Sequence, residues 1–175
     1  MRRVAVRSVV LAGLLVLGGG LPAGAASAGP VPAGPFPAEA GPLPAEAGPE
    51  ADVAYHGRVS LAHAQLRILL VPKNEGPSAL PNATVRVRLS TALADRQELA
   101  PGCARAGLRE VVCETGPLPL HGRGRHIGLA LGLWEAAPEV VVRVDTWWNG
   151  GATDRNLENN EHVVLALDTG DSYAF

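Results

Sequence analysis

The segment from residue 149 to residue 160 carries side chains that are able to bind a metal ion. Asp154, Asn156 and Glu158 alternate along it as the oxygen ligands of a calcium loop do. The central glycine, the further ligands and the distal bidentate glutamate of an EF-hand are missing. Asp and Asn side chains also bond to the backbone of their own loop. We therefore favour a structural turn and keep calcium binding as the weaker alternative.

Two adjacent tryptophans, Trp147 and Trp148, end the apolar segment that precedes this loop. Neighbouring side chains of a strand point to opposite faces, so the valines at alternate positions of 140–144 predict Trp148 in the core and Trp147 outside. An exposed tryptophan can stack on a sugar ring or anchor a protein partner. Trp147 and Asn149 are thus candidate ligand contacts. The alternative is that the loop or the N-terminal linker covers Trp147.

Cys103 and Cys113 are the only cysteines, ten residues apart in PGCARAGLREVVC. This spacing fits a hairpin closed by a disulfide. A redox-active pair would show C-x-x-C, and a metal site would need further ligands nearby; neither pattern is present. We predict a structural disulfide. A second hypothesis is a small protease inhibitor, in which the preorganised loop 102–113 presents Arg105 or Arg109 to a trypsin-like enzyme.

The five histidines are scattered along the chain and belong to no catalytic motif. Neither H-E-x-x-H nor G-x-S-x-G occurs. A catalytic triad is assembled by three-dimensional geometry, so these absences do not exclude an enzyme. The patterns nevertheless predict a non-catalytic protein without a cofactor.

These residues must be positioned by short strands. Alternating apolar and polar residues, interrupted by Gly, Pro and Asn, predict seven strands and no long helix. The strands are expected at residues 55–62, 65–71, 84–90, 108–114, 125–134, 139–148 and 161–168. In the last one, Val163, Leu165 and Leu167 are expected to form the buried face. Many short alternating strands predict an all-β antiparallel sandwich.

The first 51 residues differ from the rest in composition. Residues 1–28 have the arginines, the apolar run and the small-residue cleavage sites of a secretory signal peptide. An uncleaved membrane anchor is the alternative. Residues 29–51 form a Pro/Ala/Gly-rich linker of seven-residue repeats (GPFPAEA, GPLPAEA), whose prolines forbid a continuous helix. The folded domain is then expected at 52–170, with a short C-terminal tail at 171–175.

Charge also restricts the partners. The chain has 15 Lys and Arg against 17 Asp and Glu, and residues 1–28 hold three arginines and no acid. Cleavage after residue 28 therefore leaves 12 basic against 17 acidic residues, a net charge of −5. Such a protein lacks the electrostatic footprint for nucleic acid or for an anionic membrane. We expect a secreted, extracellular protein.

Three short patterns occur in a characteristic order: N-x-G-P-S at 74–78, P-G-C…V-V-C-E-T-G-P-L at 101–118, and D-x-N-x-E-N-N at 154–160. Together they resemble the bacterial conserved-repeat immunoglobulin-like domains, and the related CARDB (cell-adhesion-related) domains, over residues 65–167. The resemblance implies an immunoglobulin-like sandwich of about seven strands. It also implies binding, adhesion or spacing at the cell envelope or outside the cell, with a protein or a cell-wall polysaccharide as partner.

The resemblance is incomplete in two respects. The families usually occur as tandem repeats or attached to larger proteins, whereas this chain has one copy. No sortase-type L-P-x-T-G or hydrophobic anchor follows Asp168. We therefore expect a freely secreted protein and not a wall-anchored adhesin.

Overall fold

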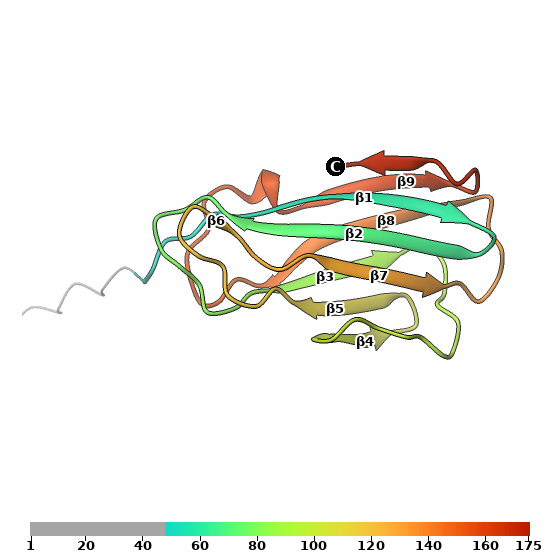
Figure 1. Cartoon of the computed structure of the whole chain (residues 1–175), viewed down its shortest axis with the longest axis horizontal. Helices are drawn as coiled ribbons and strands as arrows, with labels where there is room; N and C mark the ends of the chain where they lie inside the picture. Colours follow the sequence, from blue (N-terminus) through green and yellow to red (C-terminus); the bar gives the residue numbers. More distant parts are fainter. Residues whose placement is uncertain (1–47) are drawn as a thin grey trace, which may run out of the picture. The chain divides into compact units, whose positions relative to one another are not determined.

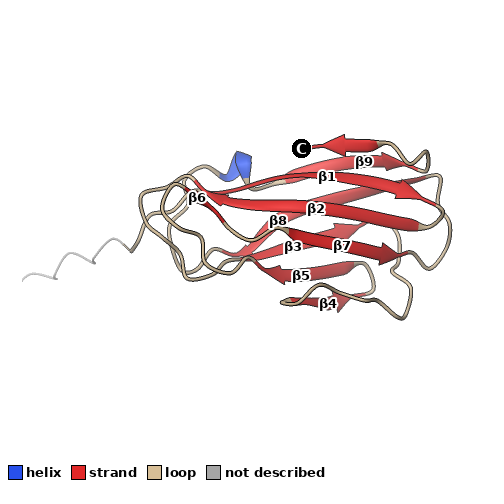
Figure 2. Cartoon of the chain, viewed as in Figure 1, coloured by secondary structure: helices blue, strands red, loops and turns tan. Residues whose placement is uncertain are grey.

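The computed structural model describes residues 48–175, which form two antiparallel β-sheets packed face to face (Figure 1). The expected signal peptide at 1–28 and the linker up to residue 47 lie outside the described residues. Strands account for nearly all of the regular structure, with one short 3-10 helix, η1 (Leu157–Asn159) (Figure 2). Within residues 48–175, no helix is long and apolar enough to cross a membrane. The predicted all-β antiparallel sandwich is confirmed.

The first sheet has the order β10-β1-β2-β6, and β7 also pairs with β2. Its strands are β1 (Val53–Ala62), β2 (Gln65–Asn74), β6 (Gly122–Arg123), β7 (Ile127–Gly132) and β10 (Ser172–Ala174). The second sheet has the order β4-β5-β3-β8-β9. Its strands are β3 (Thr84–Leu89), β4 (Cys103–Gly107), β5 (Glu110–Glu114), β8 (Glu139–Trp148) and β9 (His162–Leu167).

The core lies between the inner faces of the two sheets. In β3, Val85, Val87 and Leu89 are buried, whereas the residues between them are half-buried on the outer face. The same alternation buries every second residue of β2 and β7. Buried apolar side chains from both sheets form one continuous cluster. This cluster is the main source of the stability of the fold.

The buried face of β9 is the opposite of the predicted one. Val164 and Ala166 are buried, whereas Val163, Leu165 and Leu167 are exposed. The pairing with β8 explains the difference, because residues directly opposite each other on antiparallel strands share a face. The inward-facing Val140 and Val142 of β8 pair with Ala166 and Val164. The prediction for Val163, Leu165 and Leu167 was therefore wrong.

The folded domain is longer at both ends than the sequence predicts. At the C-terminus, Ser172–Ala174 forms β10 and pairs with residues 58–60 of β1, so the expected tail at 171–175 is part of the first sheet. At the N-terminus, Ala51 is buried, and its backbone N–H donates to the carbonyl of Thr153. The last residues assigned to the linker thus pack against the loop after β8.

Tyr55 provides a pH-dependent contribution to stability. Its ring is fully buried and its hydroxyl lies 3.0 Å from the Thr146 Oγ1. Burial raises the pKa of the Tyr55 phenol far above its usual value, and the hydrogen bond to Thr146 opposes this only in part. The unfolded chain releases that proton near pH 10, so ionisation favours unfolding as the pH rises above about 10.

We therefore expect the urea midpoint to fall between pH 9 and pH 11, and to fall less in Tyr55→Phe. At neutral pH the same variant is expected to lose about 1 kcal/mol, because Thr146 loses its hydrogen-bond partner. Tyr173→Phe, in the short β10, is the control and should keep the wild-type pH dependence. An equal alkaline loss in Tyr55→Phe would contradict this assignment.

Candidate ligand-binding face

The end of β8 contains a β-bulge that determines where the two tryptophans point. Val85 of β3 is opposite Thr146, but Thr84 is opposite Trp148, so β8 has one extra residue at this place. Thr84 belongs to the outer face of β3, and Trp148 opposite it therefore lies on the outer face as well. The prediction that Trp148 is buried was wrong, because an alternation with a period of two does not continue through a bulge.

Trp147 lies outside the core, as predicted. Its side chain is 53 % exposed, and that of Trp148 is 48 % exposed. Two large aromatic rings thus lie next to each other on the outer face of the second sheet. The guanidinium carbon of Arg86 is 5.3 Å from the centre of the Trp147 ring, within the range of a cation–π contact. We call Trp147, Trp148 and Arg86 the tryptophan face.

A buried carboxylate holds Arg86 in this position. Asp145 accepts two hydrogen bonds from Arg86, from Nε at 2.9 Å and from Nη2 at 2.7 Å. It also accepts one from Arg88 Nη2 at 2.6 Å. The hydrogen bond to Asp145 raises the pKa of Arg86 further above its usual value. Arg88 Nε is buried and has no hydrogen-bond partner among the described residues. The tryptophan face therefore combines flat apolar rings with a fixed cation.

Asn149 has a structural role in the loop that follows the tryptophans. Its Nδ2 donates to the carbonyl of Ala152 at 2.6 Å, which closes the turn that contains Gly150 and Gly151. Both glycines have positive φ, near 74° and 79°, a conformation that glycine adopts without steric cost. The loop does not cover the tryptophan rings, since both remain about half exposed. Trp147 is therefore exposed, whereas the Nδ2 group of Asn149 is bonded within the turn.

In the loop at residues 149–160, the carboxylate of Asp154 is hydrogen-bonded to other groups of the protein. Asp154 Oδ2 accepts hydrogen bonds from the Val53 backbone at 2.9 Å and from Asn160 Nδ2 at 3.0 Å, and Oδ1 accepts one from the Asn156 backbone. Asn156 and Glu158 are exposed. Among residues 48–175, no three His, Cys, Asp or Glu side chains are close enough to hold a metal ion. Asp154 ties the start of β1 to the β8–β9 loop.

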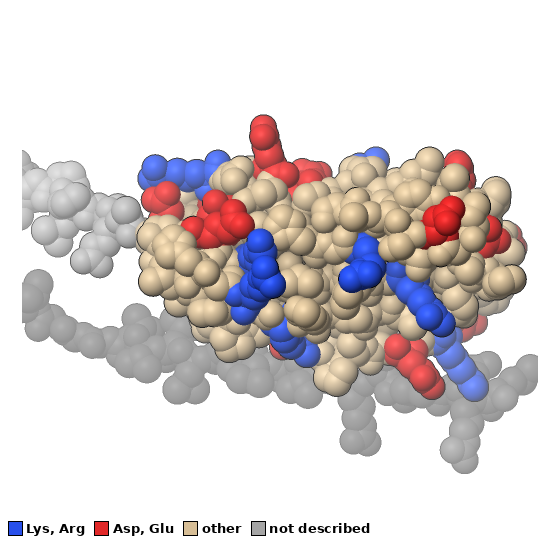
Figure 3. Space-filling view, turned by 45° about the horizontal axis from the view of Figure 1, so that its top comes forward, with Lys and Arg blue, Asp and Glu red and all other residues tan. Residues whose placement is uncertain are grey.

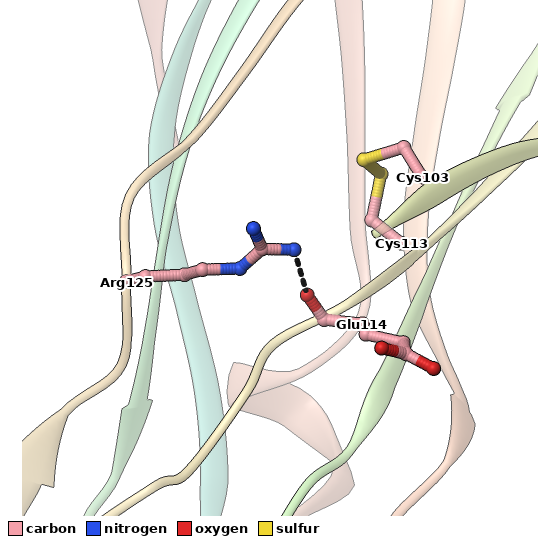
Figure 4. Close-up of a disulfide and its surroundings, with 4 residues drawn as sticks. All are labelled: Cys103, Cys113, Glu114 and Arg125. Carbon is pink, nitrogen blue, oxygen red and sulfur yellow. Dashed lines mark hydrogen bonds between the residues drawn. A yellow bond between two sulfur atoms is a disulfide. The ribbon is translucent and has the colours of Figure 1, made fainter. Parts of the chain in front are cut away.

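The disulfide between Cys103 and Cys113 is present, as predicted. The two residues are directly opposite each other on β4 and β5, with Cα atoms 4.0 Å apart. Next to it, Arg125 reaches from the segment before β7 and donates from Nη2 to the backbone carbonyl of Glu114 at 2.8 Å (Figure 4). The β4–β5 hairpin is thus held by a covalent bond and by a contact from the segment that leads into the first sheet.

The hairpin is not arranged as a protease-inhibitor loop. Arg105 donates hydrogen bonds to the carbonyls of residues 93, 94, 95 and 107, so its guanidinium is engaged with the protein's own backbone. Arg109 is exposed, but its carbonyl accepts a hydrogen bond from the Leu89 backbone at 2.8 Å. A substrate-like inhibitor must present the carbonyl of its specificity residue to the oxyanion hole of the enzyme. These contacts count against Arg105 and Arg109 in that role.

One hollow at the β2–β6 end of the sandwich gathers titratable side chains. It is open to solvent and is lined by Lys73, Glu75, His121 and Arg123 together with Asn74 and Gly122. Lys73 Nζ lies 3.8 Å from a carboxylate oxygen of Glu75. None of these lining residues is a Ser, Thr or Cys nucleophile.

Lys, Arg, Asp and Glu are spread over the face that Figure 3 draws. Figure 3 shows Lys and Arg separated by uncharged surface and by acidic residues on the face it draws. The tryptophan face thus remains the one place where exposed aromatic rings and a fixed cation coincide among the described residues. No family model, curated protein or solved structure matches the chain. The function is therefore inferred from the chemistry of this face.

Proposed function

We propose that the protein is a secreted, non-catalytic module of immunoglobulin-like type that binds saccharide chains through its tryptophan face. The observation that carries this proposal is the exposure of Trp147 and Trp148 on the same face of one strand. Tryptophan is highly buried on average, so two neighbouring exposed rings are unusual unless they bind something. The disulfide supports an oxidising compartment and hence secretion.

The chemistry of the face favours a sugar ligand. Indole rings offer a flat apolar surface to the C–H side of a pyranose ring, while their N–H groups remain polar. The guanidinium of Arg86, held by Asp145, supplies donors that are suited to hydroxyl or carboxylate oxygens of a saccharide. The bulge holds both rings on a strand, and sites on strands are more precise than sites on flexible loops.

The test is a pull-down of the purified protein with insoluble peptidoglycan, chitin and cellulose, with tryptophan fluorescence recorded in parallel. We expect retention on one of these polymers and a shift in emission on binding. The double variant Trp147→Ala/Trp148→Ala should bind about 30-fold more weakly or not at all, the loss expected for binding hot spots.

Trp134→Ala is the matched control. Trp134 is 60 % exposed, like the two tryptophans of β8, but it follows β7 and is outside the tryptophan face. Its replacement should leave retention unchanged. Equal retention of the double variant would overturn the assignment of the face, and retention on no polymer would overturn the saccharide ligand.

A further inference from the structure

β9 forms one edge of the second sheet, and among the described residues it pairs with β8 alone. The backbone N–H of Asp168 donates to the carbonyl of Pro138 at 2.8 Å. Hydrogen-bonded and non-hydrogen-bonded pairs alternate in an antiparallel ladder. The even-numbered residues of β9 therefore bond to β8, and the N–H and C=O groups of Val163, Leu165 and Leu167 point to the open edge.

The same three residues carry the exposed apolar side chains. Val163 is 56 % exposed, Leu165 46 % and Leu167 38 %. An edge strand that joins unpaired backbone groups to a row of large apolar side chains is a template for another strand. Natural edges are usually blocked by Lys, Pro or a bulge. The stretch from Val163 to Leu167 contains none of these and is regularly paired with β8.

We propose that β9 pairs in antiparallel orientation with β9 of a second copy of this chain. The two-fold axis passes beside Leu165, so that Leu165 faces Leu165 of the second copy. Val163 of each copy then faces Leu167 of the other. Val163, Leu165 and Leu167 each then face an apolar residue of the second copy. Their free backbone groups form hydrogen bonds between the two β9 strands, which joins the two five-stranded sheets into one sheet of ten strands.

The charges that flank this row are complementary under the same symmetry. On β8, Arg143 is opposite Val163, and Glu139 is opposite Leu167. When Val163 pairs with Leu167 of the second copy, one row across the four strands runs from Arg143 through this pair to Glu139 of the second copy. The two-fold axis generates the same row at the other end of the interface. The two charges are three strand spacings apart, roughly 14 Å, so they add little, and the register rests on the backbone groups and the apolar row. Val141, opposite Leu165, extends the apolar centre.

The other edges of the two sheets are poorer templates. β4 ends in a register irregularity between Arg105 and Gly107, and Arg105 is bonded to the chain near residues 93–95. β10 has three residues, and β7, at the other edge of the first sheet, carries only the small residues Gly128, Ala130 and Gly132 on its outer face. In Figure 1, β9 and β10 lie at one side of the sandwich and β4 at the other. The β9 side is therefore the side on which a second copy fits.

The dimer has a consequence for the tryptophan face, which rests on the proposed function. Residues opposite each other in a ladder share a face, so the outer faces of both copies are on the same side of the continuous sheet. Both tryptophan faces then point toward one surface. Two linked sites bind a repetitive polymer more tightly than one site does, without any new contact.

The mass of the purified protein in solution, measured by light scattering after gel filtration, tests the dimer directly. We expect twice the mass of one chain. Leu165→Lys places two like charges at the two-fold axis and should weaken the dimer about 100-fold or more, which gives a monomer. Leu108→Lys is the matched control, because Leu108 is an exposed leucine at the tip of the β4–β5 hairpin. This variant should remain a dimer.

Two further variants separate the backbone pairing from the side-chain contacts. Leu165→Pro removes an N–H that faces the open edge, so it should abolish the dimer while the β8–β9 ladder and the circular dichroism spectrum persist. Leu167→Ala removes an apolar side chain that faces Val163 of the second copy and should weaken the dimer several-fold. A monomeric wild type, or a dimeric Leu165→Lys, would overturn the proposal. Trp147→Ala/Trp148→Ala should remain dimeric, so failure of saccharide binding leaves this test intact.

Discussion

Replacing both Cys103 and Cys113 with alanine is expected to lower the free energy of unfolding by about 3 kcal/mol. The disulfide closes a short loop, and the chain-entropy model assigns about this value to a loop of its length. Alanine is the appropriate replacement, because Cys113 is buried and a serine hydroxyl there would need a partner. Urea denaturation of the variant and the wild type measures the difference.

Reduction of the wild type supplies an independent control for this prediction. A reducing agent should lower the midpoint of the wild type toward that of the double alanine variant and leave the variant unchanged. The β4–β5 hairpin should survive locally, because the backbone of Leu89 still bonds to the carbonyl of Arg109. Equal midpoints for the oxidised wild type and the variant would show that the disulfide contributes no stability.

Asn74→Ala is expected to destabilise the protein by a similar amount, about 3 kcal/mol, although it removes no apolar surface of note. Asn74 is buried, its Oδ1 accepts from the Gly76 backbone at 3.1 Å, and its Nδ2 donates to the Ser78 carbonyl at 2.7 Å. Truncation leaves these buried backbone groups unpaired, and each such group costs about 1–3 kcal/mol. Thermal and urea unfolding measure the loss.

The matched control for this prediction is Asn156→Ala. Asn156 precedes η1, is exposed, and its side chain makes no capping hydrogen bond. Its replacement should change the free energy of unfolding by less than about 0.5 kcal/mol. If both asparagine variants lose the same stability, the effect does not come from the buried hydrogen bonds of Asn74.

Hydrogen bonds within two loops explain two of the sequence patterns without reference to a ligand. In N-x-G-P-S, the side chain of Asn74 forms hydrogen bonds with the backbone of Gly76 and Ser78. Gly76 lies against the backbone of Ala51 and Asp52, which a Cβ at this position would overlap. In C-E-T-G, Thr115 is buried and its Oγ1 accepts from the Ala83 backbone at 2.9 Å. These patterns specify how two loops are held in place, and the proposed binding face lies elsewhere on the chain.

Local patterns in the sequence were sufficient for most of the fold. Each of the seven predicted strands is present, because alternation along a strand is a local property that burial of one face requires. β4, β6 and β10 were not predicted. β6 and β10 are two and three residues long, and β4 has a mostly exposed, small-residue sequence, so they exist through pairing with neighbouring strands and not through their own patterns.

The candidate site was predicted only in part. Trp147 was correctly predicted to lie outside the core, but Trp148 was wrongly assigned to it. A bulge arises from the pairing of two strands, so the alternation of residues along one strand does not reveal it. Arg86, which completes the tryptophan face, and Asp145, which holds Arg86 in place, were not identified as site residues. They are 59 positions apart in the sequence and meet because β3 and β8 are neighbours.

The amino-acid sequence by itself determined seven of the strands, the disulfide and the outward position of Trp147, because these depend on residue type and on spacing within one segment. The tertiary structure alone decided which face of β9 is buried, where Trp148 points and which arginine reaches Trp147. Alternation shows which residues share a face, but the register with the next strand selects the face that enters the core. In this protein, the register leaves the tryptophans and the edge of β9 on the surface.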